Sequence, residues 1–302
     1  MIAGYSLVIW GDFMRMARRI GLYCAMKEIT QPIFDGTYSI TTAGGYKYMY
    51  LKSSGTLTIV DKAEYDLFCV GGGGGGGGDG GHGGCGGYTT TKKALTISAG
   101  SYTVTVGAGG VPHSDYYDED LEYDVYSEYG GDGGTSKIVI GSTTISAKGG
   151  EGGNGAGTYT KGGSGGGASG YDWSDDELNS NGGNGGYDGN NGYYVAYGET
   201  AQRLKGSGGQ GTTTRAFAET SGTLYAGGGG GGVYNTSYIA GAGGAGGGGA
   251  GTGKRITAGT GGTANTGGGG GGSGIGGSTS NTKYYPRAQG GSGLVIIRWK
   301  AA

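Results

Sequence analysis

The sequence contains little proline, histidine or cysteine, and each shortage excludes a class of protein. Its 302 residues include 3 Pro, 2 His and 3 Cys. Collagen needs abundant proline and glycine at every third position. This chain has glycines in contiguous runs and almost no proline, so it is not collagen. The odd number and wide spacing of Cys24, Cys69 and Cys85 predict neither a disulfide framework nor a zinc site.

Residues for a catalytic or cofactor site are also scarce. With only His82 and His113, a His-based acid–base site or a Ser-His-Asp site has little material. On a helix with three residues per turn, Asp79, His82 and Cys85 would each lie about 9 Å from the next. That distance is too large for them to share one zinc ion. We therefore expect no enzyme activity, no cofactor and no metal. A glycosidase needs only two carboxylates, so counting residues leaves that one activity open.

The chain also lacks a strong net charge and a long apolar run. A formal net charge of −2 argues against a nucleic-acid partner, which would favour a basic face. No run of 18 apolar residues is present, so we expect no membrane span. The apolar stretch Leu7–Trp10 has no basic flank before it, unlike a signal peptide. A protein made without a signal and used outside a cell fits a virion component released by lysis.

Residues 1–31 differ in composition from the rest of the chain. Apolar side chains recur at helical spacing while three arginines fall largely elsewhere, which predicts an amphipathic helix. Two roles stay open for this segment: docking on the body of the protein, or attachment to a larger assembly. The apolar positions are Phe13, Met16, Ala17, Ile20 and Cys24, and the arginines are Arg15, Arg18 and Arg19.

Glycine and tyrosine are abundant, with 84 Gly and 25 Tyr. A disordered Gly/Ser linker would be poor in aromatic and β-branched residues, whereas this chain has many short segments rich in Thr, Tyr and Ile. These segments predict strands of an all-β sandwich, from which the glycine tracts emerge as insertions in a domain of residues 32–302. The expected strands are Gly36–Thr42, Tyr46–Leu51, Thr56–Val60, Ala63–Val70, Leu95–Ile97, Tyr102–Val106, Lys137–Ile140, Thr143–Ala147 and Gly293–Trp299.

The glycine tracts have the spacing of polyglycine II helices. Such a helix has three residues per turn and no internal hydrogen bonds, and only glycine lets neighbouring backbones touch. Non-glycine residues recur every third position at Asp79, His82, Cys85 and Tyr88, at Tyr129, Asp132 and Thr135, and at Asn181, Asn184, Tyr187, Asn190 and Tyr193. We expect these residues to form the solvent-facing edges of peripheral helices. The pure runs Gly71–Gly78, Gly227–Gly232, Gly246–Gly249 and Gly267–Gly272 should be interior, and the expected helices cover 71–87, 149–170, 181–192, 227–232, 241–253 and 259–277.

Tyrosine-rich islands interrupt the glycine body. The segment Asp115–Tyr129 interleaves seven acidic residues with five tyrosines. Tyr, Trp, Asn, Ser and Asp together are typical of antibody binding loops, and aromatic faces also suit sugars. Two alternatives stay open: solvated turns at helix ends, and calcium binding by the acidic run, although EF-hand spacing is missing. The candidate receptor-binding residues are Tyr116, Tyr117, Tyr123, Tyr126, Trp173, Tyr187, Tyr193, Tyr194, Tyr197, Tyr234, Tyr238, Tyr284 and Tyr285.

An ordered series of strand-and-glycine blocks carries a family resemblance. The blocks are "YDLFCVGGGGGGGG", "YTVTVGAGG", "GGTSKIVIGSTTISAKGGEGG", "GTLYAGGGGGG" and "GGSGLVIIRW". Over roughly residues 55–300 the chain resembles the glycine-rich domain of bacteriophage tail and fibre proteins. The acidic insertion Ser114–Tyr129 and the N-terminal segment depart from the family's usual pattern.

The resemblance implies a jelly-roll-like β-sandwich with polyglycine helices, in a trimeric virion adhesin. That adhesin would recognise a host-surface glycan or protein, and its N-terminal segment would attach to other virion proteins. The alternative is a purely structural virion protein, such as a head fibre, collar or decoration subunit. A bacterial surface adhesin would need an export signal, which residues 1–30 do not supply.

Overall fold

The computed structural model describes residues 28–301 with short gaps. The gaps are 79–80, 113–115, 119–122, 126–128, 155–159, 171–180, 197–202, 205, 234–237, 254–258, 277–282 and 285–287. In the short strands at 116–118, 123–125, 195–196, 203–204, 275–276 and 283–284 only the backbone is described. The helix expected before residue 28 lies outside the described residues.

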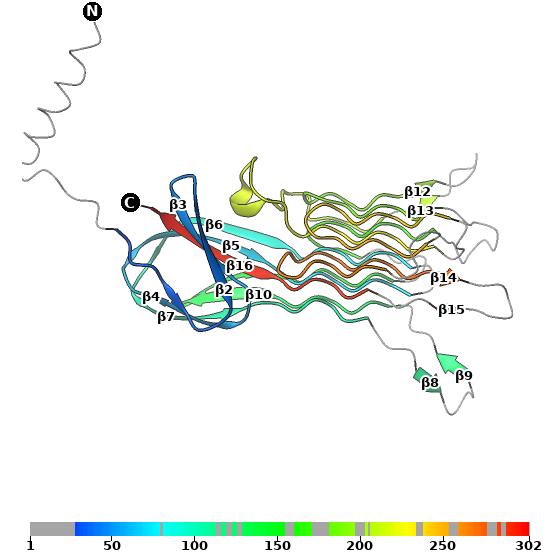
Figure 1. The fold of residues 1–302 in the computed structure, drawn as a ribbon, viewed down its shortest axis with the longest axis horizontal. Coiled ribbons are helices and arrows are strands. Elements are labelled where there is room, and N and C mark those ends of the chain that lie inside the picture. The colour runs from blue at the N-terminus through cyan, green and yellow to red at the C-terminus, as the bar shows by residue number, and fades with distance from the viewer. Residues whose placement is uncertain are drawn as a thin grey trace, which may run out of the picture.

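A β-sandwich of two five-stranded sheets forms one end of the molecule (Figure 1). The first sheet contains, in order, β1 (Ile33–Phe34), β4 (Gly55–Ile59), β7 (Gly100–Thr105), β10 (Ser136–Ile140) and β11 (Thr143–Ala147). The second contains β2 (Tyr38–Ala43), β3 (Tyr46–Leu51), β16 (Leu294–Lys300), β5 (Ala63–Val70) and β6 (Thr89–Ile97). All neighbouring strands pair antiparallel, and the predicted all-β sandwich is confirmed.

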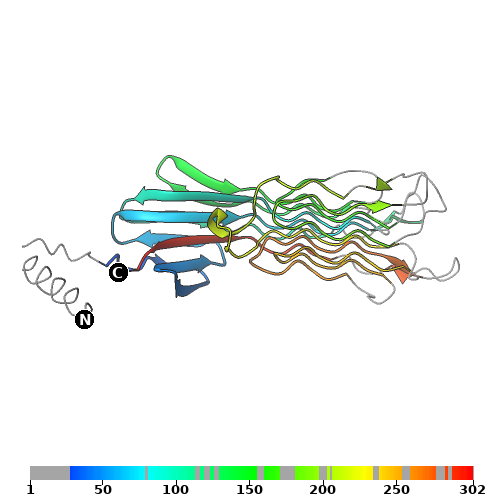
Figure 2. The ribbon, with the colours of Figure 1, turned by 90° about the horizontal axis from the view of Figure 1, so that it is seen from above.

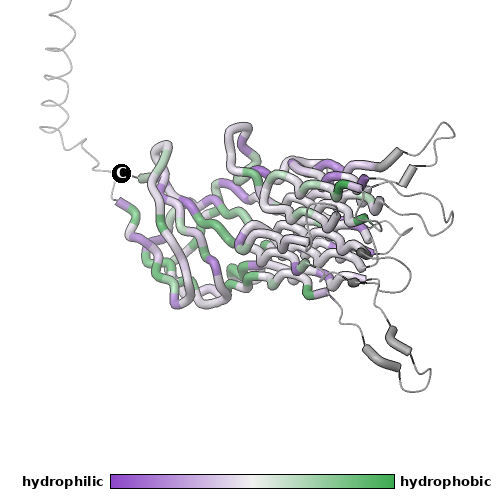
Figure 3. Tube along the Cα trace, turned by 45° about the vertical axis from the view of Figure 1, so that its right-hand side comes forward, coloured by the Kyte–Doolittle hydropathy of each residue, from purple (hydrophilic) through white to green (hydrophobic). Residues whose placement is uncertain are grey.

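Alternating apolar residues of both sheets make the core between them. Leu57, Val104 and Ile138 point inward from the first sheet and meet Leu67 and Val295 of the second. Successive side chains of a strand face opposite sides, so each strand contributes about every second residue. Figure 3 shows the apolar residues concentrated in the sandwich, whereas the glycine body is close to neutral in hydropathy.

Strand β16 is buried on both faces, which explains its nearly continuous apolar sequence. On the outer side, Ile296 packs in a second cluster with Phe68 and Phe217. Phe217 belongs to η1 (Ala216–Ala218), a short 3-10 turn that covers this face of the sheet. The exception in the strand is Arg298, whose side chain is also buried.

The glycine body extends from the sandwich as a bundle of narrow tracts that run along its length (Figures 1 and 2). Its organisation is clearest at Gly71–Gly78, which leads directly out of β5. Every third backbone N–H of this tract bonds to one neighbour: Gly71 N to Tyr88 O at 3.0 Å, then Gly74 N to Cys85 O at 2.8 Å. Gly77 N continues the row to His82 O at 2.9 Å. Tract 81–88 therefore lies antiparallel beside it.

The other residues of the same tract bond in other directions. Gly72 and Gly75 donate to the tract at 131–134, and Gly73 and Gly76 donate to the tract at 288–291. The carbonyl groups of 71–78 accept hydrogen bonds from three further tracts. The donors are the N–H group of residue 110 in one tract, those of 150 and 153 in the second, and those of 270 and 273 in the third. With three residues per turn, donors and acceptors each point in three directions. The tract is thus bonded to six neighbours, as is tract 227–233.

Close approach explains why these tracts are glycine. A Cβ atom added at Gly73 would lie 2.1 Å from the carbonyl oxygen of Gly268, and one at Gly84 would lie 2.2 Å from that of Gly74. Real Cβ atoms do not approach backbone atoms this closely. The carbonyl groups of Gly268 and Gly74 cannot move away, because each accepts a hydrogen bond from another tract. The six-neighbour packing therefore excludes side chains at such positions.

Three of the four pure glycine runs are interior. Gly71–Gly78, Gly227–Gly232 and Gly267–Gly272 are buried, as predicted. The prediction for Gly246–Gly249 is wrong, because Gly246 (φ +101°) and Gly247 (φ +96°) form a partly exposed turn.

The predicted exposed edge at His82 and Cys85 is also wrong. His82 is 1 % exposed and Cys85 is fully buried. Tract 81–88 is enclosed by 71–77, 148–154, 162–168, 227–232 and 267–272, with which it shares hydrogen bonds. The other expected edges, at 129, 132 and 135 and at 181, 184, 187, 190 and 193, are exposed as predicted.

Polar side chains complete the hydrogen bonding at these edges. Asp132 Oδ1 accepts from Gly152 N at 2.8 Å. Asn181 Oδ1 and Asn184 Oδ1 accept from the N–H groups of residues 239 and 242, each at 2.8 Å. Each side-chain oxygen accepts a hydrogen bond from a backbone N–H group. In an interior tract, a backbone carbonyl of a neighbouring tract would accept that bond.

Glycine packing gives a direct test. A Cβ at Gly229 would lie 2.0 Å from Gly270 O, whereas one at Gly208 has nothing nearer than 3.7 Å. We expect Gly229→Ala to lower the free energy of unfolding by about 2 kcal/mol or more through overpacking. The control Gly208→Ala should leave it unchanged or raise it by up to about 1 kcal/mol, because the unfolded chain loses freedom. Denaturant titration measures both, and equal effects would contradict the close-contact explanation.

Candidate recognition surface

Three short hairpins lie at the end of the glycine body away from the sandwich, here called the distal end (Figures 1 and 2). They are β8 (Tyr116–Asp118) with β9 (Tyr123–Val125), β12 (Val195–Ala196) with β13 (Arg203–Leu204), and β14 (Ile275–Gly276) with β15 (Lys283–Tyr284). The described chain starts at the sandwich, where Glu28 Oε1 pairs with Lys47 Nζ at 2.6 Å. It also ends there, after β16. The hairpins and the described ends of the chain therefore lie at opposite ends of the molecule.

Most of the candidate recognition residues that the structure describes are at this distal end. Four of them are strand residues of the hairpins, and two more, Tyr193 and Tyr194, stand directly before β12 and are 50 % and 53 % exposed. Tyr238 is partly exposed and follows tract 227–233 beyond its distal end. The four in hairpins are Tyr116, Tyr117, Tyr123 and Tyr284. Tyr126, Trp173, Tyr197, Tyr234 and Tyr285 lie outside the described residues.

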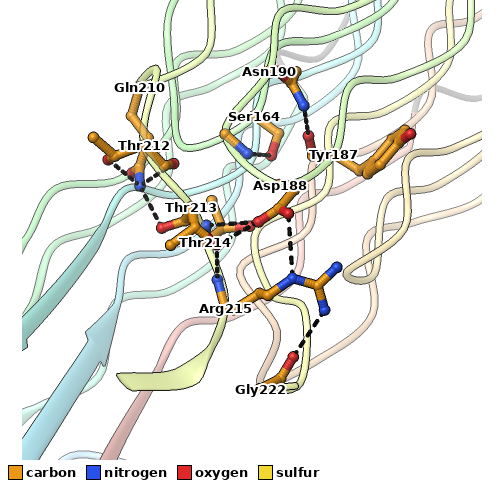
Figure 4. Close-up of polar contacts among 11 residues, drawn as sticks. Ser164, Tyr187, Asp188, Asn190, Gln210, Thr212, Thr213, Thr214, Arg215 and Gly222 are labelled. Carbon is orange, nitrogen blue, oxygen red and sulfur yellow. Dashed lines mark hydrogen bonds and ion pairs between the residues drawn. The ribbon is translucent and has the colours of Figure 1, made fainter. Parts of the chain in front are cut away.

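Tyr187 is placed at the opposite end. Directly after it the chain reverses at Asp188 (φ +54°) and Gly189 (φ +81°). Asp188 Oδ2 pairs with Arg215 Nε at 3.2 Å, and Arg215 leads into η1 on the second sheet (Figure 4). Tyr187, although exposed, therefore sits beside the sandwich and apart from the hairpins.

The same region fixes the glycine body to the sandwich. Gln210 Oε1 accepts from Thr89 N at 3.1 Å, and Gln210 Nε2 donates to Thr89 Oγ1 at 2.9 Å, which ties the 206–214 loop to the start of β6. Gln210 Nε2 also donates to the carbonyls of Thr212 and Thr213 (Figure 4). Sequence reasoning missed this junction, because Gln210 and Asp188 belong to no spacing pattern.

Negative charge is concentrated in the segment that carries the first hairpin. Residues 115–129 contain seven acidic residues and no Lys or Arg, while the remaining 16 acidic residues are outnumbered by 21 Lys and Arg. Asp118 and Asp124 stand in β8 and β9 themselves. The sequence of this one segment therefore carries a negative charge that the net charge of the chain conceals.

The described residues contain neither a helix that could span a membrane nor a cluster of metal ligands. No described helix has the length and apolar character needed to cross a bilayer. No group of three His, Cys, Asp or Glu side chains within the described ranges could hold a metal ion.

A family model described as a glycine-rich domain matches residues 52–300. The chain belongs to the glycine-rich domain family. The match begins just before β4 and ends with β16, so this glycine-rich domain comprises most of the sandwich and the whole glycine body. The resemblance inferred from the strand-and-glycine blocks is confirmed at this level. No curated protein matches the chain significantly.

We expect the first hairpin, β8 and β9, to contribute little to the stability of the glycine body. Strands β8 and β9 pair with each other and with no other described strand, and Pro112 and Gly130 form an antiparallel bridge at their base. A two-residue turn can join such bridged positions. We expect replacement of residues 113–129 by Gly-Gly to change the free energy of unfolding by less than about 1 kcal/mol. Denaturant titration checks this, and a loss of several kcal/mol would show that the segment supports the body.

Proposed function

We propose that this glycine-rich domain protein is a bacteriophage virion adhesin that displays tyrosine-rich segments for recognition of the host surface. The observation that carries the proposal is the collection of three hairpins, with Tyr193 and Tyr194, at the distal end (Figure 1). The described ends of the chain and the sandwich occupy the other end. This arrangement supports a display role, because it leaves one end available for attachment and the other for contacts with a partner.

The glycine body suits the supporting role. Its tracts are bonded in several directions at once, so the positions at which the hairpins leave it are fixed relative to one another. Segments held on a rigid base lose less entropy on binding than segments on a flexible linker. Tyrosine adds contact area at a low entropic cost and offers an apolar face and a polar edge, which suits a host glycan or protein.

We propose a binding role for the protein, without catalysis. His82 is buried inside the glycine body, and its Nδ1 is 3.2 Å from the carbonyl oxygen of Asn154. It has no open position from which to exchange protons with a substrate. Seven of the 23 acidic residues, the type that a glycosidase would use, lie in the first hairpin segment. Asp66 and Glu219, which stand near each other on the sandwich, are both paired with Arg298.

The virion setting rests on the resemblance to phage tail and fibre proteins. In that setting, the segment before residue 28 would attach the chain to other virion proteins, and three chains would assemble as in other fibres. The competing hypothesis is a structural virion protein without a receptor, because a rod with bonded tracts would also serve as a spacer or decoration.

Host adsorption distinguishes the two hypotheses. We expect virions that carry Tyr116→Ser, Tyr117→Ser, Tyr193→Ser and Tyr194→Ser to adsorb about 30-fold more weakly, the effect of losing about 2 kcal/mol of contact energy. Tyr187→Ser is the matched control, since Tyr187 is an exposed tyrosine at the sandwich end. It should leave adsorption unchanged. Normal adsorption of the fourfold variant would favour the structural role.

A further inference from the structure

A cavity of about 440 Å³ opens on the outer face of the second sheet, between β2–β3 and the segment 216–225. One wall is aromatic: Tyr46, Tyr48 and Tyr50 are alternate residues of β3 and share its outer face. The rings of Tyr48 and Tyr50 are stacked, with centroids 6.3 Å apart and planes inclined by 22°. Ser221 and Thr223 of the covering segment also line the cavity.

Hydroxyl groups around this cavity are available for hydrogen bonds. Within the described part of the chain, the side chains of Thr41, Ser221 and Thr223 have no hydrogen-bond partner, and neither have the phenol groups of Tyr46 and Tyr50. The cavity therefore combines apolar ring faces with several donors and acceptors. Small-molecule sites commonly have a volume of about 300–1,000 Å³ and a few convergent polar groups on an aromatic lining.

The charges at the cavity disfavour an anionic ligand. Its cation, Arg298, already donates to Asp66 Oδ2 at 2.8 Å and to Glu219 Oε1 at 2.7 Å, and its guanidinium lies 4.0 Å from the centre of the Phe217 ring. Arg298 is thus neutralised by two carboxylates and has no charge left for a phosphate or carboxylate ligand.

Glu219 supplies an acceptor at the edge of the cavity. Lys93 and Arg298 both approach its Oε1, so Oε2 has no partner among the described residues. The hydrogen bond from Arg298 keeps the pKa of Glu219 below its usual range, and the carboxylate is ionised at neutral pH. An ionised carboxylate oxygen is a strong acceptor for a ligand hydroxyl.

We propose that this cavity is a binding site for a neutral saccharide. The guanidinium of Arg298 already lies over the Tyr46 ring, 4.4 Å from its centre. A sugar ring would therefore place its apolar face on Tyr50, and its hydroxyls would bond to Glu219, Ser221 and Thr223. A second cavity of about 620 Å³ adjoins the first and shares Tyr46, Glu219 and Arg298 with it, which leaves room for a second sugar. The site lies on the sandwich, far from the distal hairpins, and does not depend on recognition there.

Ligand-observed NMR with the purified full chain tests the proposal. The probes are maltose, cellobiose, lactose and N,N′-diacetylchitobiose, with glucuronate as an anionic comparison. We expect at least one neutral disaccharide to bind with Kd of about 1 mM or tighter, and glucuronate to bind more weakly. Thr223→Val, which removes a hydroxyl but keeps the shape, should weaken binding about 10-fold. Thr103→Val, at an exposed threonine of the first sheet, is the matched control and should have no effect.

Tyr50→Ala should also abolish binding, with thermal unfolding as a check that the variant folds. If it does not fold, Thr223→Val carries the test alone. The proposal is wrong if none of the four disaccharides binds, or if binding survives Thr223→Val unchanged. It is equally wrong if the variant with Gly-Gly in place of 113–129 loses binding, because the sugar would then sit at the distal hairpins.

Discussion

The backbone hydrogen bond between glycine tracts at van der Waals distance is the constraint on which the rest of this structure depends. A polyglycine II helix makes no bonds within itself, so each N–H and C=O must find a partner on a neighbour. Tracts 71–78 and 227–233 meet that demand with six neighbours each. Such packing is possible only without Cβ atoms, and the high glycine content of the sequence follows from it. The entropy lost by ordering glycine is large, so these bonds must be nearly complete for the body to be stable.

The sandwich provides the template from which the tracts start. Strands β5 and β16 lie side by side in the second sheet and continue directly into tracts at 71–78 and 288–293. Their register, Leu294 opposite Val70, sets the alignment of the two tracts that adjoin them. Further tracts add to this pair through rows of bonds that repeat every third residue. A conventional hydrophobic core thus fixes the arrangement of a body that has almost no hydrophobic core of its own.

The alternation of apolar and polar residues predicted nine of the ten strands of the sandwich, and the glycine runs predicted three of the four interior tracts. Strand β1 and the strands of the distal hairpins were missed, and β6 (Thr89–Ile97) is longer than the expected Leu95–Ile97. They failed at His82 and Cys85 because a three-residue phase shows which residues share a face, but not whether that face meets solvent. That depends on how many tracts surround it, and the tracts at 131–134 and 288–291 are too short to be recognised in the sequence. Gly246 and Gly247 were misassigned because glycine adopts a positive φ as readily as the polyglycine conformation. At the candidate site, composition indicated the tyrosine-rich segments, but only the fold separates Tyr187 from the others.

The bonding pattern also has a mechanical consequence. Tracts 71–78, 81–88, 227–233 and 267–274 run back and forth along the long axis, while their hydrogen bonds lie across it. A pull between the distal hairpins and the sandwich therefore loads whole rows of bonds in shear, and these must break together. The same bonds pulled apart sideways would break one after another. The molecule is therefore stiffest along its long axis, between the sandwich and the distal hairpins.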